Sequence, residues 1–314
     1  MSTLPAPFVG SKNVGFFQKN LLHFSFFQEN QSDPPIEFHG LDARMTIQYA
    51  GGKSYPVLHA SIFNIAEQYR HRLASFGQYN QTVPKKRYWV RVSAKRSQGK
   101  NDRVSYSRVF SAPLVTTYTD YHHVPDIITV IEAKPLAGFN LVGSPAVSFS
   151  GTVTAEQIVR TMVSNFKQKF SSDPELGTAE LEHVVNHGVT HSLTNPHYYG
   201  DIKSQLDRCA HDANFTYHLQ DGFLYMRPWN ATASGLEPLK LSPKSGLIGD
   251  PDYSSQGLHL KTLFNPSLRF GQPISIQDST SLANGVWTQM ISLTHHLSTT
   301  QSRDQWFTEL QVTR

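Results

Sequence analysis

The sequence predicts a mainly β protein with an inserted α/β unit. Two long stretches, 43–150 and 241–314, alternate apolar and polar residues with a period of two, which is typical of half-buried strands. Between them, residues 151–240 carry a 3.6-residue apolar stripe and a turn signature between two aromatic-rich runs. These observations predict two antiparallel β-rich domains and a small α+β middle domain, after an aromatic-rich N-terminal arm at 1–42.

The composition limits the classes of protein to consider. The chain has 314 residues and a net charge of +4, which is too weak to indicate a nucleic-acid-binding protein. Only 17% of residues are charged and 11% are aromatic, so we expect part of the surface to be covered by partners. Cys209 is the single cysteine, which excludes an intrachain disulfide and a cysteine-based zinc site, as in a protein made in a reducing cytoplasm.

The N-terminal arm, 1–42, is rich in phenylalanine. Leu22, Phe24 and Phe26 alternate with polar residues, which predicts a strand with one buried face. We favour an edge strand of the chain's own core, and the alternative is an arm that docks on a neighbouring subunit. The first residues lack a basic region followed by an apolar run, and no stretch reaches the roughly 18 apolar residues of a membrane span, so we expect neither a signal peptide nor a membrane anchor.

The first β-rich domain, 43–150, is predicted to consist mostly of strands, such as 45–49, 88–92, 104–114 and 127–131. Residues 62–76 are ambiguous, because Ile65, Tyr69 and Leu73 recur at a spacing that also fits a short helix. The basic loop 95–103 has no glycine spacing for a phosphate cradle, so we interpret it as a solvated hairpin tip.

The middle domain, 151–240, gives the sharpest local signals. Thr154 and Gln157 have the spacing of a capping box, and the apolar stripe that follows predicts a helix over 154–170. A second helix is predicted over 200–214, with Cys209 on its apolar face. Asp221-Gly222 then predicts a hairpin between 215–219 and 223–227.

The second β-rich domain, 241–314, repeats features of the first. Trp287, Gln289, Ile291 and Leu293 are predicted to share one strand face, and Trp306, Thr308, Leu310 and Val312 another. In each half a strand and a histidine-containing loop precede an aspartate, Asp126 or Asp304, that opens the next strand. This near-repeat has two equally good explanations: two related small barrels in one chain, or chance similarity between antiparallel units.

The residues indicate no catalytic, cofactor or metal site. His183, His187 and His191 would share a helix face, but the residues around them are poor helix formers and no His-Glu-x-x-His motif is present. The pairs His122-His123 and His295-His296 fall in corresponding loops, where we expect hydrogen bonding or subunit contacts. Glu180, Glu182 and Asp201 have no spacing that marks a glycosidase, and Cys209 is expected to be inert core.

The segment from Ser245 onward resembles the baseplate hub proteins of contractile-tailed bacteriophages (the myovirus tail hub family). The resemblance rests on Ser-Gly-Leu-Ile-Gly at 245–249 with Pro251, the run 257–271, Asn284-Gly285 and a tryptophan before the final strand, and it extends over about 43–314. It gives eight residues a structural role in the fold: Gly246, Gly249, Pro251, Asn265, Pro266, Gly271, Trp287 and Trp306.

The resemblance implies a non-enzymatic virion protein of the tail baseplate, assembled in the cytoplasm of the bacterial host. Such hubs carry two tail-tube-like antiparallel β-barrel domains per chain and assemble as homotrimers, so three chains would join the sixfold tail tube to the threefold central spike. Implied partners are the tail tube protein and the spike protein, with the tape measure and baseplate wedge proteins as further candidates, and DNA would only pass through the lumen during ejection. The alternatives are a tail-associated cell-wall hydrolase and another adaptor, such as a distal tail protein.

Overall fold

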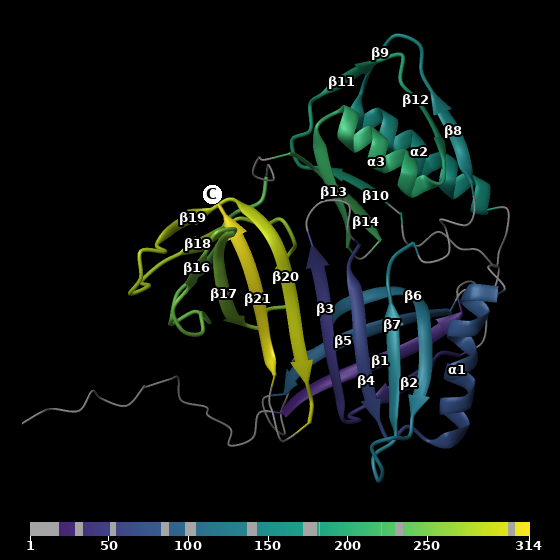
Figure 1. Ribbon diagram of the computed structural model, residues 1–314, viewed down its shortest axis with the longest axis vertical. Coiled ribbons are helices and arrows are strands. Elements are labelled where there is room, and N and C mark those ends of the chain that lie inside the picture. The colour runs from purple at the N-terminus through teal and green to yellow at the C-terminus, as the bar shows by residue number, and fades with distance from the viewer. Residues whose placement is uncertain are drawn as a thin grey trace, which may run out of the picture.

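The computed structural model describes residues 19–28, 34–50, 55–82, 88–97, 105–136, 143–171, 181, 183–220, 222–229, 235–300 and 305–314. Figure 1 shows two groups of long strands side by side and, above them, a unit with two helices. The predicted class, mainly β with an α/β insertion, is confirmed. In the described part of the chain, no helix combines the length and the apolar character that a membrane crossing requires.

One antiparallel sheet of 11 strands runs through both β-rich parts. In spatial order its strands are β16 (Asp252–Ser254), β17 (Gly257–Leu263), β21 (Trp306–Thr313), β20 (Gln289–Ser298), β3 (Ala43–Ala50), β4 (Val57–Phe63), β7 (Ile128–Ala133), β6 (Ser107–Asp120), β5 (Tyr88–Ser97), β1 (Lys19–Gln28) and β2 (Ile36–His39). The two parts meet where β3 pairs with β20, from Ser292 opposite Ala50 to Ser298 opposite Arg44. Their buried residues form one continuous core.

Strand β1 lies inside this sheet, between β5 and β2. Leu22, Phe24 and Phe26 are buried, which confirms the predicted strand with one buried face. The edge position was wrong, because the four-residue β2 covers β1 and itself forms the edge. The described part of the predicted arm is therefore a component of the sheet, and residues 1–18 lie outside the described residues.

The ambiguous segment divides between a strand and a helix, β4 and α1 (Glu67–Thr82). Helix α1 packs on β6, with Leu73 and Phe76 buried. Gly77 allows this close approach, because a Cβ there would lie 2.8 Å from the backbone nitrogen of Thr117. Of the predicted basic loop, 95–97 belong to β5 and 98–103 lie outside the described residues.

The middle unit contains the two predicted helices, α2 (Ala155–Ser171) and α3 (Ile202–Asp212), and the predicted hairpin of β13 (Phe215–Gln220) and β14 (Phe223–Pro228). Gln220 pairs with Phe223 around the turn, where Gly222 has a φ of +86°. Five short strands complete the unit: β8 (Ser144–Ser148), β9 (Thr152–Thr154), β10 (His183–Asn186), β11 (Ser192–Thr194) and β12 (His197–Gly200).

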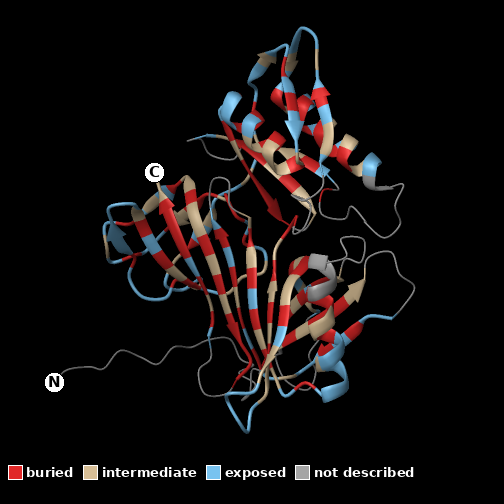
Figure 2. Ribbon diagram, turned by 45° about the vertical axis from the view of Figure 1, so that its right-hand side comes forward, coloured by how far each residue is buried: buried red, intermediate tan, exposed pale blue. Residues whose placement is uncertain are grey.

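This unit has a core of its own, separate from the core of the large sheet. Figure 2 shows buried residues both along the long strands and between the helices and strands of the upper unit. Leu136 and Val147 pack in the upper core, so part of the segment that the sequence division assigned to 43–150 lies with the middle unit. The division into an arm, two β-rich domains and a middle domain stays a prediction.

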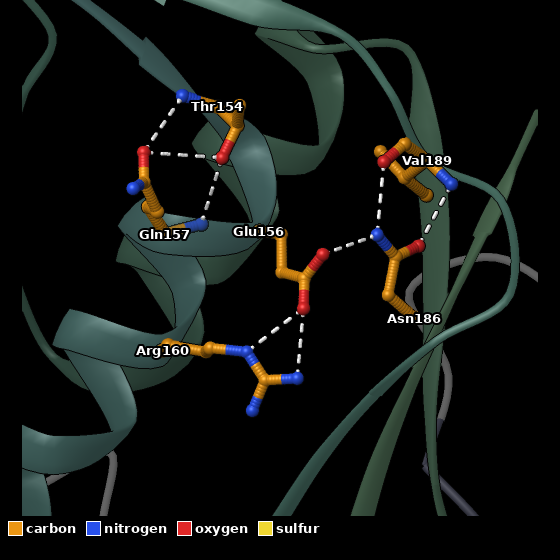
Figure 3. Close-up of polar contacts among 6 residues, drawn as sticks. All are labelled: Thr154, Glu156, Gln157, Arg160, Asn186 and Val189. Atoms are coloured by element: carbon orange, nitrogen blue, oxygen red, sulfur yellow. Dashed lines mark hydrogen bonds and ion pairs between the residues drawn. The ribbon is translucent and has the colours of Figure 1, made fainter.

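A polar network fixes the start of α2, as Figure 3 shows. The predicted capping box is present: the Gln157 N–H donates to Thr154 Oγ1 (3.3 Å), and the Thr154 N–H donates to Gln157 Oε1 (3.4 Å). Glu156 accepts from Asn186 Nδ2 (2.7 Å) and pairs with the exposed Arg160 (2.7 Å). These contacts, with the Asn186 hydrogen bond as the largest cause, lower the pKa of the Glu156 carboxyl.

Asn186 also closes the turn after β10, since it donates to the Val189 carbonyl (2.9 Å) and accepts from the Val189 N–H (2.7 Å). We expect Asn186→Ala to lower the free energy of unfolding by about 2 kcal/mol, because three partly buried hydrogen bonds are lost together. Arg160→Ala is the control on the other side of Glu156 and should cost about 0.5 kcal/mol, as an exposed ion pair does. Urea unfolding measures both, and equal losses would contradict the prediction.

The remaining strands form a small sheet of β15 (Leu239–Leu241), β18 (Ile274–Ile276) and β19 (Gly285–Trp287). The face predicted for Trp306, Thr308, Leu310 and Val312 is confirmed, since all four are buried. The face predicted from Trp287 to Leu293 is wrong. A bulge between Met290 and Ser292 changes the alternation, so Met290 and Leu293 are buried and Ile291 is not.

Candidate functional site

The segment that carries the hub resemblance forms one end of the large sheet. Residues 246–254 run along the free side of β17: the Leu263 N–H donates to the Gly246 carbonyl (2.8 Å), and the Ile248 N–H donates to the Lys261 carbonyl (2.7 Å). Strand β16 then continues this pairing with β17. The motif therefore builds the sheet edge, where backbone groups are available to another chain.

The glycines of the motif have positive φ values, a backbone conformation that costs other residues conformational free energy. Gly246 has a φ of +116°, Gly249 of +70° and Gly271 of +83°. Asn265 Oδ1 accepts from the Ser267 N–H (2.9 Å), which makes a local turn around Pro266. Pro251 is buried at the start of the segment that leads into β16. The role of these residues in carrying the fold stays a prediction.

The two tryptophans of the predicted set lie on the strands before and after β20 in the sequence, Trp287 on β19 and Trp306 on β21. Trp287 donates from Nε1 to the Ala283 carbonyl (2.8 Å), and its ring carries the Arg314 guanidinium 4.6 Å from the ring centroid. Trp306 packs edge-on against Phe264, with ring centroids 5.6 Å apart. Both tryptophans are buried, so they join the motif segment to the strands behind it.

Large apolar side chains are exposed on this edge and on the segment 282–286, which leads into β19 and lies near the edge through the contacts Tyr253–Trp287 and Thr280–Asp250. Tyr253 of β16 is 57% exposed and Leu282 is 92% exposed. The set, which we call the apolar edge patch, consists of Ile248, Tyr253, Leu263, Leu282 and Val286. An exposed strand edge flanked by apolar side chains is chemically suited to pairing with a strand of another subunit.

A cavity of about 280 Å³ lies where the β13–β14 hairpin of the middle unit meets the loop 269–271. His218 stacks on Tyr225 (4.9 Å between centroids) and meets Phe270 edge-on (5.1 Å). Arg227 is buried above Phe270 and donates to the Met290 carbonyl (3.4 Å). Burial lowers the pKa of His218 to about 3, with the Arg227 charge as a further cause. The cavity therefore marks the contact of the middle unit with the large sheet.

The structure separates the histidines that the sequence placed together. His183 lies on β10, His187 follows it in a bend beside Tyr225, and His191 precedes β11, so the three share no helix face. His122 and His123 lie in the turn after β6, where both approach Asp120. The expected loop position of His295-His296 is wrong, because both lie within β20. His295 is buried against Thr308 Oγ1 (2.8 Å), and His296 contacts Glu309 (3.2 Å).

The other candidates have local structural roles. Asp201 caps α3 by accepting from the Ser204 N–H (3.0 Å). Cys209 is buried in the core of the middle unit, and desolvation raises the pKa of its thiol to about 12, which fits the expected inert residue. Glu180, Glu182 and Asp304 lie outside the described residues.

The sequence patterns did not predict two groups of neighbouring polar residues. Buried Arg227 and His218 line the cavity. In the sequence, each was marked only as a polar residue within one of the two aromatic-rich runs of the predicted hairpin. His23, Glu37 and His39 meet on β1 and β2. The period-two pattern places His23 on the polar face of its strand, but only the strand register brings it opposite His39.

Comparison with known proteins agrees with this geometry. Residues 38–310 match the family model described as baseplate hub gp41. A comparison with curated proteins finds no match.

Solved structures share the fold. A tail protein from Neisseria meningitidis MC58 is 10% identical with a TM-score of 0.58, and the match covers 93% of this chain and 96% of that one. The 43 kDa tail protein of prophage MuSo2 from Shewanella oneidensis is 9% identical (TM-score 0.56, 93% and 96% covered). The E. coli c3393 protein is 8% identical (TM-score 0.55, 92% and 76% covered), and it is described as a type VI secretion component similar to T4 bacteriophage tail proteins gp27 and gp5.

The family match over residues 38–310 decides the assignment, and the fold agrees with it. The chain belongs to the baseplate hub gp41 family and is a structural protein of the phage tail baseplate.

Proposed function

We propose that three copies of this chain form a closed ring that joins the sixfold tail tube to the threefold central spike. The observation that carries the proposal is the large sheet with two different free ends, β16 and β2, in a chain of the hub family. When one edge of a subunit binds the other edge of the next, the contact is head to tail, and such contacts form a ring when the rotation between neighbouring subunits closes after a whole number of copies.

The two β-rich parts of each chain would allow a threefold ring to match the sixfold tail tube. If each part occupies the place of one tube subunit, three chains present six such units to the tube and keep threefold symmetry toward the spike. A similarity to proteins described in complexes of PdpA and VgrG supports a spike-side partner, with a TM-score of 0.53 over 59% of one such chain. DNA would pass through the ring, and the protein would have no enzymatic step of its own.

The apolar edge patch is the proposed subunit contact. We expect the wild-type chain, mixed with tube and spike proteins at micromolar concentration, to form a trimer by native mass spectrometry and a threefold ring by electron microscopy. A chain that stays monomeric in this mixture would contradict the proposal. Six chains per ring would instead indicate an adaptor of the distal-tail type.

We expect Tyr253→Glu to weaken trimer formation at least about 30-fold, because a charge buried at the centre of an interface costs 2 kcal/mol or more. Tyr199→Glu is the matched control, since Tyr199 is an equally exposed tyrosine on β12, away from the sheet edge. Analytical ultracentrifugation measures both equilibria, and equal weakening by the two variants would exclude the edge patch as the contact.

The enzymatic alternative has a direct test. Peptidoglycan zymography of the purified chain should show no clearing. A cleared zone that disappears in His187→Ala would show a hydrolase and overturn the non-enzymatic proposal, whatever the result of the ring experiment.

A further inference from the structure

Two histidines and a glutamate lie together on the face of the sheet edge that points away from the large core. In the β1–β2 pair, His23 is directly opposite His39, and Glu37 lies two residues before His39 on the same face. Phe24 and Phe38, on the alternate positions, are buried in the core. The strand register alone therefore brings one carboxylate and two imidazoles to one place.

The donor atoms of this group are close enough to share one ion. His23 Nε2 lies 3.7 Å from Glu37 Oε1, and His39 Nε2 lies 3.6 Å from Glu37 Oε2. The ligand atoms all lie within 4.8 Å of one another. Neighbouring ligands of a tetrahedral zinc ion, at bond lengths of about 2.0–2.1 Å, are about 3.3 Å apart. The two histidine–glutamate distances are within a few tenths of an ångström of that spacing, and the wider pairs of the group reach it when a side chain reorients.

His23 Nε2 is a buried nitrogen, and none of the residues that the structure describes forms a hydrogen bond with it. Such a polar atom loses its hydration without compensation unless a further partner is present. The Tyr106 ring lies edge-on to both imidazoles, at 5.7 and 6.3 Å between centroids, and screens the group from one side. This buried Nε2, 3.7 Å from a carboxylate oxygen, is the second observation that points to a bound cation.

We propose that His23, Glu37 and His39 bind one divalent transition-metal ion of the zinc type. Two imidazole nitrogens and one carboxylate oxygen suit zinc, whereas calcium and magnesium prefer oxygen ligands alone. The described residues supply three ligands, and water completes the fourth position. The two rings stack at 3.9 Å and 11°, so binding requires the His39 ring to tilt, and its side chain is 54% exposed and free to do so.

The ion would fasten the edge of the sheet. Strand β2 has only four residues and, of the strands that the structure describes, pairs with β1 alone. A metal bridge between His23 and His39 would therefore connect the last strand of the sheet to its neighbour. Because the ligands come together only in the folded sheet, the ion binds the folded state and raises its stability. This inference does not depend on the proposed ring, and the monomeric chain suffices to test it.

The test uses the full chain, stripped with EDTA and titrated with zinc sulfate at neutral pH by isothermal titration calorimetry. We expect about one zinc ion per chain and a rise in melting temperature. Cobalt(II) should give the visible absorption of a tetrahedral ion, which reports the ligand set directly. Loss of one direct ligand in His39→Gln should weaken binding at least about tenfold, the lower limit found even for supporting residues.

His39→Gln is the preferred variant, because the exposed side chain can be changed without loss of core packing. The chain offers a matched control in His122, which lies with His123 and Asp120 in a second group of two histidines and one carboxylate. His122 is 93% exposed, and His122→Gln should leave zinc binding unchanged.

Several results would overturn the proposal. These are the absence of zinc binding to the wild-type chain, equal zinc binding by the wild type and His39→Gln, a loss of binding in His122→Gln, or equally tight binding of magnesium.

Discussion

Alanine in place of Gly257 is expected to lower the free energy of unfolding by about 4 kcal/mol. Gly257 opens β17 with a φ of +124°, which costs a residue with a side chain about 1–3 kcal/mol. Its Cβ would also overlap the Val312 carbonyl oxygen and lie 3.2 Å from the carbonyl carbon behind it. Because that oxygen belongs to the paired strand β21, relief requires a shift of the backbone, at a further cost of about 1–3 kcal/mol.

Gly249→Ala separates the two causes. Gly249 also has a positive φ, +70°, but no atom lies within 4 Å of the place where its Cβ would be. We expect this variant to lose only about 1 kcal/mol, the conformational cost alone. Urea unfolding of both variants gives the comparison. If the two substitutions are equally mild, the close approach of β17 and β21 at Gly257 does not exist.

Acid is expected to destabilise the protein through two buried histidines. Burial lowers the pKa of His218 and of His295 to about 3, from an ordinary value of 6.5. Between pH 3 and 6.5 the unfolded chain binds more protons than the folded chain, so stability is complete above pH 6.5 and is lost as the pH falls. From pH 7.5 to 5 each histidine should cost about 2 kcal/mol, or about 4 kcal/mol for the pair.

The surroundings of both groups explain the direction. His218 lies between aromatic rings beside the Arg227 charge, and His295 meets Tyr49 and Phe264 edge-on, with His296 as a nearby charge when protonated. Neither histidine has a carboxylate contact among the described residues, so protonation brings no compensating ion pair.

Unfolding curves at pH 7.5 and 5 measure the effect. His218→Phe keeps an aromatic ring in the stack, and His295→Gln keeps a polar partner for Thr308, so each variant should halve the acid loss. His122→Gln, at an exposed position, should leave it unchanged. A wild-type protein equally stable at both pH values would show that these histidines titrate normally.

Features that depend on neighbouring residues could be predicted from the sequence. The Thr154 capping box, the stripe of α2 and the β13–β14 hairpin each involve groups a few residues apart, and all three lie where the pattern placed them, although Asp221 of the turn lies outside the described residues. The bulge after Met290 could not be predicted in this way. The residue types around the bulge are those of a regular strand, so the sequence does not indicate where the extra residue lies. That extra residue moves Ile291 out of the core.

Features that depend on strand order were beyond the sequence pattern. Alternation showed that β1 has one buried face, but it could not show that β2 covers its edge. The same limit applies to the candidate sites: His23 and His39 are 16 residues apart and meet only through the β1–β2 register. Part of the apolar edge patch also depends on strand order, since Tyr253 is exposed on β16, the last strand of the large sheet, whereas Leu282 and Val286 come from the turn before β19 and from β19 of the small sheet.

The pairing of β3 with β20 also determines the order in which the molecule can be built. The Ala43 N–H donates to Thr299 Oγ1 across 256 residues of sequence, so the two halves of the sheet cannot join until the end of β20 has left the ribosome. Helices α2 and α3 have a separate core and can condense earlier during synthesis. Long-range pairing of this kind slows folding, and until it is complete the long strand β3 presents an open edge to other nascent chains.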